Sequence, residues 1–132
     1  MIGIDTSVLV RYVAQDDAEQ CRVVNELFEQ ASAKNKLFVS VVVVVECLWV
    51  LVGHYHLTDE QAYAFIQSLL VSKKVSLERS GMFMALLAKN NFKAKELADT
   101  IIASTALDAG CEKFFTFDAK LASLVSDKLL NK

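Results

Sequence analysis

Residues 37–52 read LFVSVVVVVECLWVLV, and only Ser40 and Glu46 in this run are not apolar. Such a run is shorter than the roughly 20 residues that a membrane-spanning helix needs, and it carries a carboxylate, so we expect it inside a folded domain. A buried carboxylate without a partner costs roughly several kcal/mol, so it is protonated, pairs with a cation or serves chemistry. We therefore expect Glu46 to be buried and to mark a functional site.

The same run contains the boundary between two predicted elements. Residues 37–39 are expected to form a strand, and Ser40 can cap a helix from Val41 to about Tyr55. The five consecutive valines would also suit a strand that continues to Val45. We favour the helix because the run is too long for an ordinary strand and its later apolar residues keep helical spacing.

The rest of the chain predicts alternating strands and helices in one domain, residues 1–132. An apolar fraction of 54% and a mean hydropathy of +0.34 suit a parallel sheet covered on both faces. We expect an α/β fold, a three-layer α/β/α sandwich with a central sheet of four or five parallel strands. The other expected strands are residues 2–4, a short strand near Val75, residues 113–116 and an edge strand around Leu129.

Composition excludes several classes of protein. The four glycines are scattered, so the chain has neither a P-loop nor a dinucleotide-binding fingerprint. The N-terminal residues MIGIDTS lack a basic, apolar leader, and we expect a cytoplasmic protein that does not enter the membrane. Three widely separated cysteines indicate reduced core thiols and not disulfides or a thiolate metal site: Cys21, Cys47 and Cys111.

Four acidic residues interrupt apolar segments and are candidates for one site. Asp5 and Asp118 each follow a predicted strand, which places both at the carboxyl rim of the sheet where ligands of open α/β folds bind. Glu46 and Asp99 lie on predicted helices that could pass over this rim. Like charges this close need a cation, and oxygen ligands select Mg²⁺ or Mn²⁺. Such an ion can generate hydroxide and stabilise a phosphodiester under attack.

Each acid also has a local explanation that involves no ligand. Asp5 and Asp118 could be helix N-caps, and Asp99 could be an exposed helical residue. Glu46 could be protonated in the core or reach the surface with its carboxyl group. Glu96 is either a fifth acid of the site or a first-turn charge that favours the helix dipole.

The acids stand in four motifs whose order is more specific than any one of them. These motifs are IGIDTSVLV around Asp5, VECLWVL around Glu46, ADTIIASTA around Asp99 and TFDAKLA around Asp118. The ordered set covers essentially the whole chain and resembles PIN-domain proteins, of the branch that includes the VapC ribonuclease toxins.

The resemblance implies a hydrolase, a Mg²⁺- or Mn²⁺-dependent endoribonuclease whose metal-binding acids are Asp5, Glu46, Asp99 and Asp118. It implies an RNA substrate, single-stranded or structured, as well as a homodimer and a cognate antitoxin of a type II toxin-antitoxin pair. Ser7 and Thr116 match positions that support the site or substrate. The sequence departs from the family pattern at Ser7, where asparagine is frequent, and at Glu96, where aspartate is frequent. No proline follows Ser40.

Two other functions compete with the nuclease hypothesis. One is a phosphoaspartate protein, a phosphatase or a receiver domain, with Asp5 as the nucleophile. Ser7 argues against the phosphatase, whose mechanism wants a second aspartate two residues after the first. The other is a non-catalytic PIN-like module that binds a partner through its apolar surface.

Overall fold

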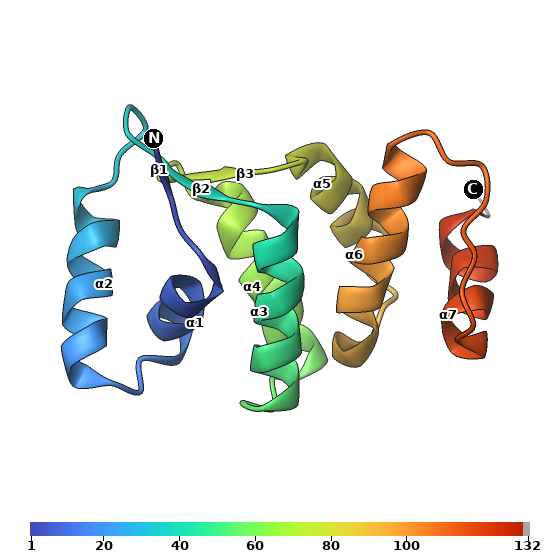
Figure 1. Ribbon diagram of the computed structural model, residues 1–132, viewed down its shortest axis with the longest axis horizontal. Helices are drawn as coiled ribbons and strands as arrows, with labels where there is room; N and C mark the ends of the chain where they lie inside the picture. Colours follow the sequence, from blue (N-terminus) through green and yellow to red (C-terminus); the bar gives the residue numbers. More distant parts are fainter. Residues whose placement is uncertain (131–132) are drawn as a thin grey trace.

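The structure, a computed structural model, describes residues 1–130 and has three parallel strands surrounded by helices (Figure 1). The sheet order is β1-β2-β3, with Ile2 opposite Leu37 and Leu37 opposite Val75. The strands are β1 (Ile2–Gly3), β2 (Leu37–Val39) and β3 (Val75–Leu77). The helices are α1 (Thr6–Ala14), α2 (Ala18–Gln30), α3 (Val41–Gly53), α4 (Asp59–Val71), α5 (Ser80–Lys89), α6 (Ala94–Asp108), α7 (Ala119–Leu124) and the π-helix η1 (Val125–Leu129).

Side-chain caps begin the helices close to where the sequence predicts. The Ser40 hydroxyl accepts a hydrogen bond of 3.2 Å from the Val43 amide, so the valine run is helical and not extended. Thr58 and Gln61 form a capping box at the start of α4. The cap of α2 is Asp17, whose side chain accepts from the Gln20 amide.

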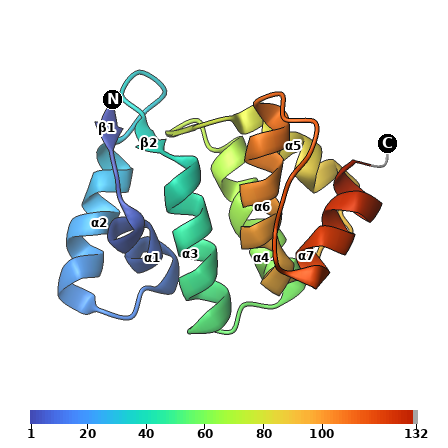
Figure 2. The same cartoon turned by 45° about the vertical axis from the view of Figure 1, so that its right-hand side comes forward.

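Helix α3 is the centre of the hydrophobic core. Its residues Val44, Cys47, Leu48 and Leu51 are almost completely buried, since the helix packs against α1 on one side and α6 on the other. A helix that is apolar around most of its circumference is stable only when neighbours cover it in this way. Figures 1 and 2 show α3 in the middle of the molecule, with α2 beyond α1 at one end and α7 beyond α6 at the other.

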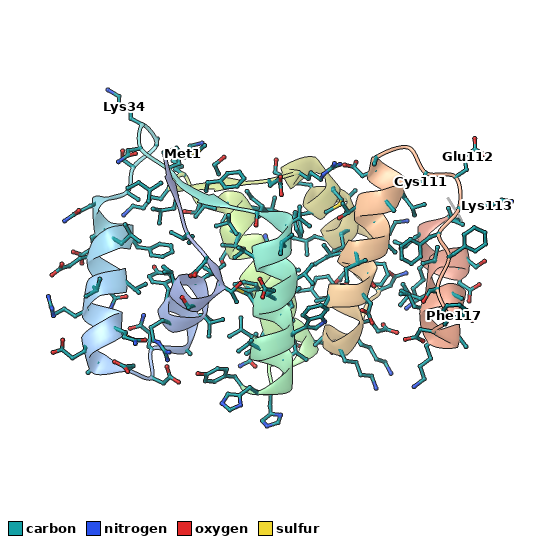
Figure 3. All side chains as sticks on the ribbon, viewed as in Figure 1. Met1, Lys34, Cys111, Glu112, Lys113 and Phe117 are labelled. Atoms are coloured by element: carbon teal, nitrogen blue, oxygen red, sulfur yellow. The ribbon has the colours of Figure 1, made fainter. Side chains whose placement is uncertain are left out.

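The α/β class and the parallel sheet agree with the predicted fold, but two predicted strands are wrong. Residues 113–116 have no regular secondary structure, and Leu129 lies in η1, so the sheet of residues 1–130 has three strands and not four or five. The reason is that α7 and η1 pack on α6 and hold the chain there, far from β1 (Figure 1). Figure 3 shows Phe117 at the opposite end of the molecule from Met1.

The exposure of two side chains also differs from expectation. Glu46 is exposed, and it shares one face of α3 with the exposed Val42 and Trp49. The run is apolar on nearly every side, so its sequence pattern did not reveal which narrow face stays in solvent. Cys111 is exposed, whereas Cys21 and Cys47 are buried as predicted. Among residues 1–130, no helix is both long enough and apolar enough to cross a membrane.

Candidate active site

Asp5 lies two residues beyond β1 and caps the N-terminus of α1. Its Oδ1 accepts hydrogen bonds from the Ser7 hydroxyl at 2.7 Å and from the Val8 amide at 3.1 Å. These two donors, the Ser7 hydroxyl first, lower the pKa of Asp5 because they favour the charged carboxylate. The local explanation as an N-cap is therefore correct, and it keeps Asp5 ionised at the carboxyl end of a strand.

Glu46 approaches Asp5 from a distant part of the chain. The Thr6 hydroxyl, next to Asp5, donates a hydrogen bond of 3.1 Å to Glu46 Oε1 and so joins α1 to α3. We call these two acids the Asp5–Glu46 pair. Neither makes an ion pair with a basic residue of the described chain. The Thr6–Glu46 hydrogen bond thus ties Glu46 to the first turn of α1, which Asp5 caps, on the surface and not in the core.

The charges of Glu46 and Asp5 also affect the pKa of Cys47, a residue buried beneath them. Its thiol is completely buried and contacts the Thr6 carbonyl oxygen at 3.8 Å. Burial first, and then the negative charges of Glu46 and Asp5, raise the pKa of this thiol to about 12. The thiol is therefore protonated at neutral pH and is no nucleophile.

The other acids gather between α6 and α7. A cavity of about 220 Å³ is lined by Glu96, Asp99 and Asp118, together with Lys95 and Lys120. We call the three acids the α6–α7 acids. Asp99 is half-buried at the margin of this cavity, as its place on the edge of the apolar stripe predicts. Neither lysine forms an ion pair with these acids in the described chain.

Local hydrogen bonds position two of the α6–α7 acids. Asp118 caps α7, since its Oδ1 accepts from the amides of Lys120 at 2.9 Å and Leu121 at 3.2 Å. Its own amide donates to the Thr116 hydroxyl at 3.0 Å, so Thr116 supports the backbone of Asp118, whereas Ser7 bonds to the carboxylate of Asp5. Glu96 accepts a hydrogen bond of 2.8 Å from the Lys93 amide, and it is therefore also a first-turn capping residue of α6.

The four predicted acids do not meet in a single pocket. Within residues 1–130, no three acidic, histidine or cysteine side chains are grouped closely enough to hold a metal ion. Asp118 starts α7, which lies beyond α6, whereas Asp5 starts α1 on the other side of α3 (Figures 1 and 2). The structure therefore presents the Asp5–Glu46 pair and the α6–α7 acids as two separate groups.

The donor set of the Asp5–Glu46 pair fits a hard divalent cation. Asp5 Oδ2 and Glu46 Oε2 make no hydrogen bond with any described residue, while the first oxygen of each acid is held in place. Mg²⁺ takes one or two protein carboxylates and completes its octahedron with water and substrate phosphate. Two oriented carboxylates with free oxygens and no basic partner meet this requirement.

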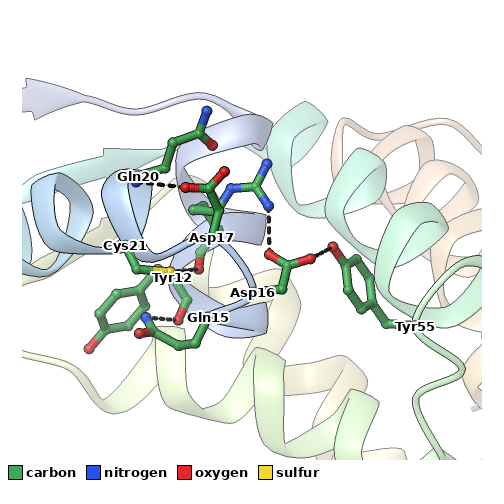
Figure 4. A network of polar contacts seen from close by, with 8 residues as sticks. Tyr12, Gln15, Asp16, Asp17, Gln20, Cys21 and Tyr55 are labelled. Atoms are coloured by element: carbon green, nitrogen blue, oxygen red, sulfur yellow. Dashed lines mark hydrogen bonds and ion pairs between the residues drawn. The ribbon is translucent and has the colours of Figure 1, made fainter.

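A polar network at the far end of α1 was missed by the sequence analysis. Asp16 accepts hydrogen bonds from the Tyr55 hydroxyl and from Arg11 Nη1, the latter at 2.6 Å (Figure 4). These donors, Tyr55 first, lower the pKa of Asp16. The partners are separated by up to 39 positions in sequence, so no local pattern signals the network. It ties the residues just after α3 to the C-terminal end of α1.

Comparison with known proteins agrees with this architecture. A family model for the PIN domain matches residues 2–125. No curated protein and no solved structure matches the chain. Since the match spans all three strands and all four candidate acids, the chain belongs to the PIN domain family, whose members are generally metal-dependent nucleases.

Proposed function

We propose that the protein is a Mg²⁺- or Mn²⁺-dependent endoribonuclease that hydrolyses phosphodiester bonds of single-stranded RNA. One observation carries the proposal: Asp5 and Glu46, 41 positions apart, are linked through Thr6 at the carboxyl end of β1 with no basic partner in the described chain. Two neighbouring carboxylates without a counter-charge favour the binding of a cation. Family membership supports nuclease chemistry.

Each residue of the site has a distinct part in the proposal. Asp5 and Glu46 would hold the metal through their free oxygens, and a bound Mg²⁺ or Mn²⁺ would activate water and stabilise negative charge on the phosphate. Ser7 keeps Asp5 ionised, and Thr6 orients Glu46. Asp99 and Asp118 are proposed as further ligands, with Glu96 as a possible additional acid.

The direct test is cleavage of a labelled single-stranded RNA with and without Mg²⁺ or Mn²⁺. We expect the wild-type protein to cleave only with metal, and Asp5→Asn, Glu46→Gln and Asp99→Asn to lose cleavage while their circular dichroism spectra stay unchanged. Glu60→Gln is the matched control, because Glu60 is exposed in the first turn of α4 and makes no side-chain hydrogen bond in the described chain. Unaltered cleavage by the Asp5→Asn/Asp99→Asn double variant would refute the proposal.

The cellular part of the proposal is that this nuclease acts in the cytoplasm as the toxin of a type II toxin-antitoxin pair. Induced expression should then arrest growth, whereas expression of Asp99→Asn should not. A DNA-binding antitoxin encoded by a short adjacent reading frame should restore growth when it is expressed with the wild-type protein. Growth that is unaffected by an active nuclease would contradict the toxin role and leave the nuclease proposal standing.

A second candidate is a PIN-like module without catalysis, and the separation of the acids into two groups favours it. The Asp5–Glu46 pair and the α6–α7 acids do not form one metal-binding group within residues 1–130. Titration with Mn²⁺ distinguishes the two candidates. A nuclease should bind Mn²⁺, and binding should be lost in Glu46→Gln, whereas the non-catalytic module should show no Mn²⁺ affinity in either form.

A further inference from the structure

The outer edge of β1 is open to pairing with another strand. The Ile2 and Ile4 amides donate to carbonyl groups beside and within β2, at 3.0 and 3.2 Å, so the peptide groups of Gly3 between them face the opposite side. Within residues 1–130, no strand occupies that side. Met1 and Ile2 are substantially exposed there, and a Cβ atom built on Gly3 would meet nothing within 4 Å. An exposed strand edge of this kind readily pairs with another chain.

Residues 113–117, KFFTF, have the properties of a strand that lacks a partner. Phe115 is 90% exposed and Phe117 is fully exposed, and because these residues are two apart they would share one face if the segment were paired as a strand. The peptide groups of residues 112–117 make no backbone-to-backbone hydrogen bond with the described chain. Two exposed phenylalanines beside each other form an apolar patch that favours being covered, and the peptide groups next to them are free to pair with a strand.

Both ends of the KFFTF segment are fixed to its own chain on the side away from β1. The segment begins just after α6, and α7 and η1 then return along α6, where they bury Leu124 and Val125. Lys128 Nζ donates to the Asn91 carbonyl oxygen at 2.6 Å and lies 5.4 Å from the centre of the Phe92 ring. In Figure 1 this unit and β1 lie at opposite ends of the molecule. While α7 and η1 stay docked, the segment can reach only another molecule.

We infer that the KFFTF segment of one copy adds as a parallel strand to the β1 edge of a second copy, and that the exchange is reciprocal. Each pairing would satisfy the peptide groups on both sides and cover the two phenylalanines with apolar residues near Met1 and Ile2. Reciprocal use of the same two surfaces gives a closed dimer with twofold symmetry in which the β1 edge of each copy is paired.

The parallel orientation has a consequence for the acidic site, and this part rests on the proposed function. Asp118 is the residue immediately after the segment, and Asp5 stands two residues after the end of β1. Both acids therefore follow the carboxyl end of their segment closely. Parallel strands place their carboxyl ends at the same rim. The dimer would therefore bring Asp118 of one copy to the Asp5–Glu46 pair of the other. Asp99 would lie on α6 of the copy that supplies Asp118, so each site would contain residues of both chains.

The oligomeric state of the full chain, measured by size-exclusion chromatography with light scattering, tests the pairing without any reference to activity. The wild type should be a dimer, and Phe117→Lys should be a monomer. Gly3→Pro should also be a monomer, because proline removes an outward N–H and leaves the hydrogen bonds of Ile2 and Ile4 to β2 in place. Met84→Lys is the control, since Met84 is 62% exposed on α5 and should leave the dimer intact. A monomeric wild type, or a dimeric Phe117→Lys, would overturn the inference.

Complementation between two inactive variants tests the shared site. Asp5→Asn and Asp118→Asn should each be inactive, but chains co-expressed with different tags should regain about a quarter of wild-type cleavage, because random pairing leaves one site in four intact. If the wild-type protein is dimeric and active but the co-expressed variants recover no activity, a shared site is excluded. If the dimer tests succeed and wild-type protein cleaves no RNA with Mg²⁺ or Mn²⁺, the proposed function fails and the strand pairing stands.

Discussion

The Thr6 hydroxyl donates a hydrogen bond of 3.1 Å to Glu46 Oε1 and thereby joins the first turn of α1 to the middle of α3. Thr6 follows Asp5 directly in the chain, so the bond ties Glu46 to the turn that Asp5 caps. A residue that orients a ligand in this way controls the geometry of the site without contacting the substrate.

Thr6→Val should reduce RNA cleavage on the order of tenfold, since loss of a group that orients a metal ligand typically has an effect of this size. The free energy of unfolding should change little, because the shape of the side chain is preserved. Single-turnover cleavage and urea denaturation measure the two effects. Thr6→Ser keeps the donor and is the control, so equal losses in the serine and valine variants would contradict the orienting role.

Ser7→Ala should move the acidic limb of the pH–cleavage profile to higher pH. The Ser7 hydroxyl is the largest cause of the lowered pKa of Asp5, so its removal raises that pKa and protonates the carboxylate at a higher pH. Rates measured between about pH 4 and 8 show the shift. Ser80→Ala is the control, because Ser80 lies on α5 and should leave the profile unchanged. An unchanged limb in Ser7→Ala would contradict the role of Ser7.

Asp16→Asn should lower thermal stability at neutral pH, and the difference from wild type should shrink in acid. The folded-state pKa of Asp16 is lowered by Tyr55 and Arg11, so its contribution to stability is complete above the model-peptide value of 3.8 and is lost as the pH falls through the folded-state pKa. Melting temperatures at a series of pH values test this. Glu29→Gln, an exposed acid on α2, should show no such pH dependence.

Two neighbouring residues of α5 should differ sharply in their effect on stability. Phe83 is completely buried, and Phe83→Ala should lower the free energy of unfolding by about 3–5 kcal/mol through lost burial and a remaining cavity. Met84 points outward, so Met84→Ala should change it by at most about 0.5 kcal/mol. Urea denaturation monitored by circular dichroism compares the two. If both variants lost similar amounts of unfolding free energy, the face of α5 that carries Phe83 would not be part of the core.

A thiol reagent should label one cysteine of the folded protein. Cys111 is exposed and should react quickly, whereas Cys47 is buried, with its pKa raised to about 12, and should react only after unfolding. Mass spectrometry of the labelled protein counts the modified thiols in native buffer and in denaturant. Cys111→Ser should remove the fast reaction, and a fast reaction that survives in this variant would show that a second thiol is accessible.

Local signals in the sequence predicted most of the elements because they act over a few residues. Ser40 and Asp5 are caps whose partners lie three positions away, so their roles were visible before the structure. The ordered motifs around the four acids also predicted the family correctly, since that information is the sequence itself.

The position of the acids depended on contacts that no local pattern contains. Glu46 belongs to a helix that is apolar on almost every side, and only the packing of α1 and α6 against α3 left its one face in solvent. Residues 113–116 have strand-like composition, but a strand exists only where another strand pairs with it. Residues Leu124 and Val125 hold this segment beside α6, and the separation of Asp118 from Asp5 follows from that docking.

The sequence by itself thus determined most of the elements, several of their caps, the acidic residue types and the family. Tertiary structure alone decided that Thr6, next to Asp5, bonds to Glu46, whereas Asp99 and Asp118 line a cavity between α6 and α7. The physical reason is range: helix periodicity and capping depend on neighbours three or four positions away, whereas the meeting of carboxylates depends on how complete helices pack.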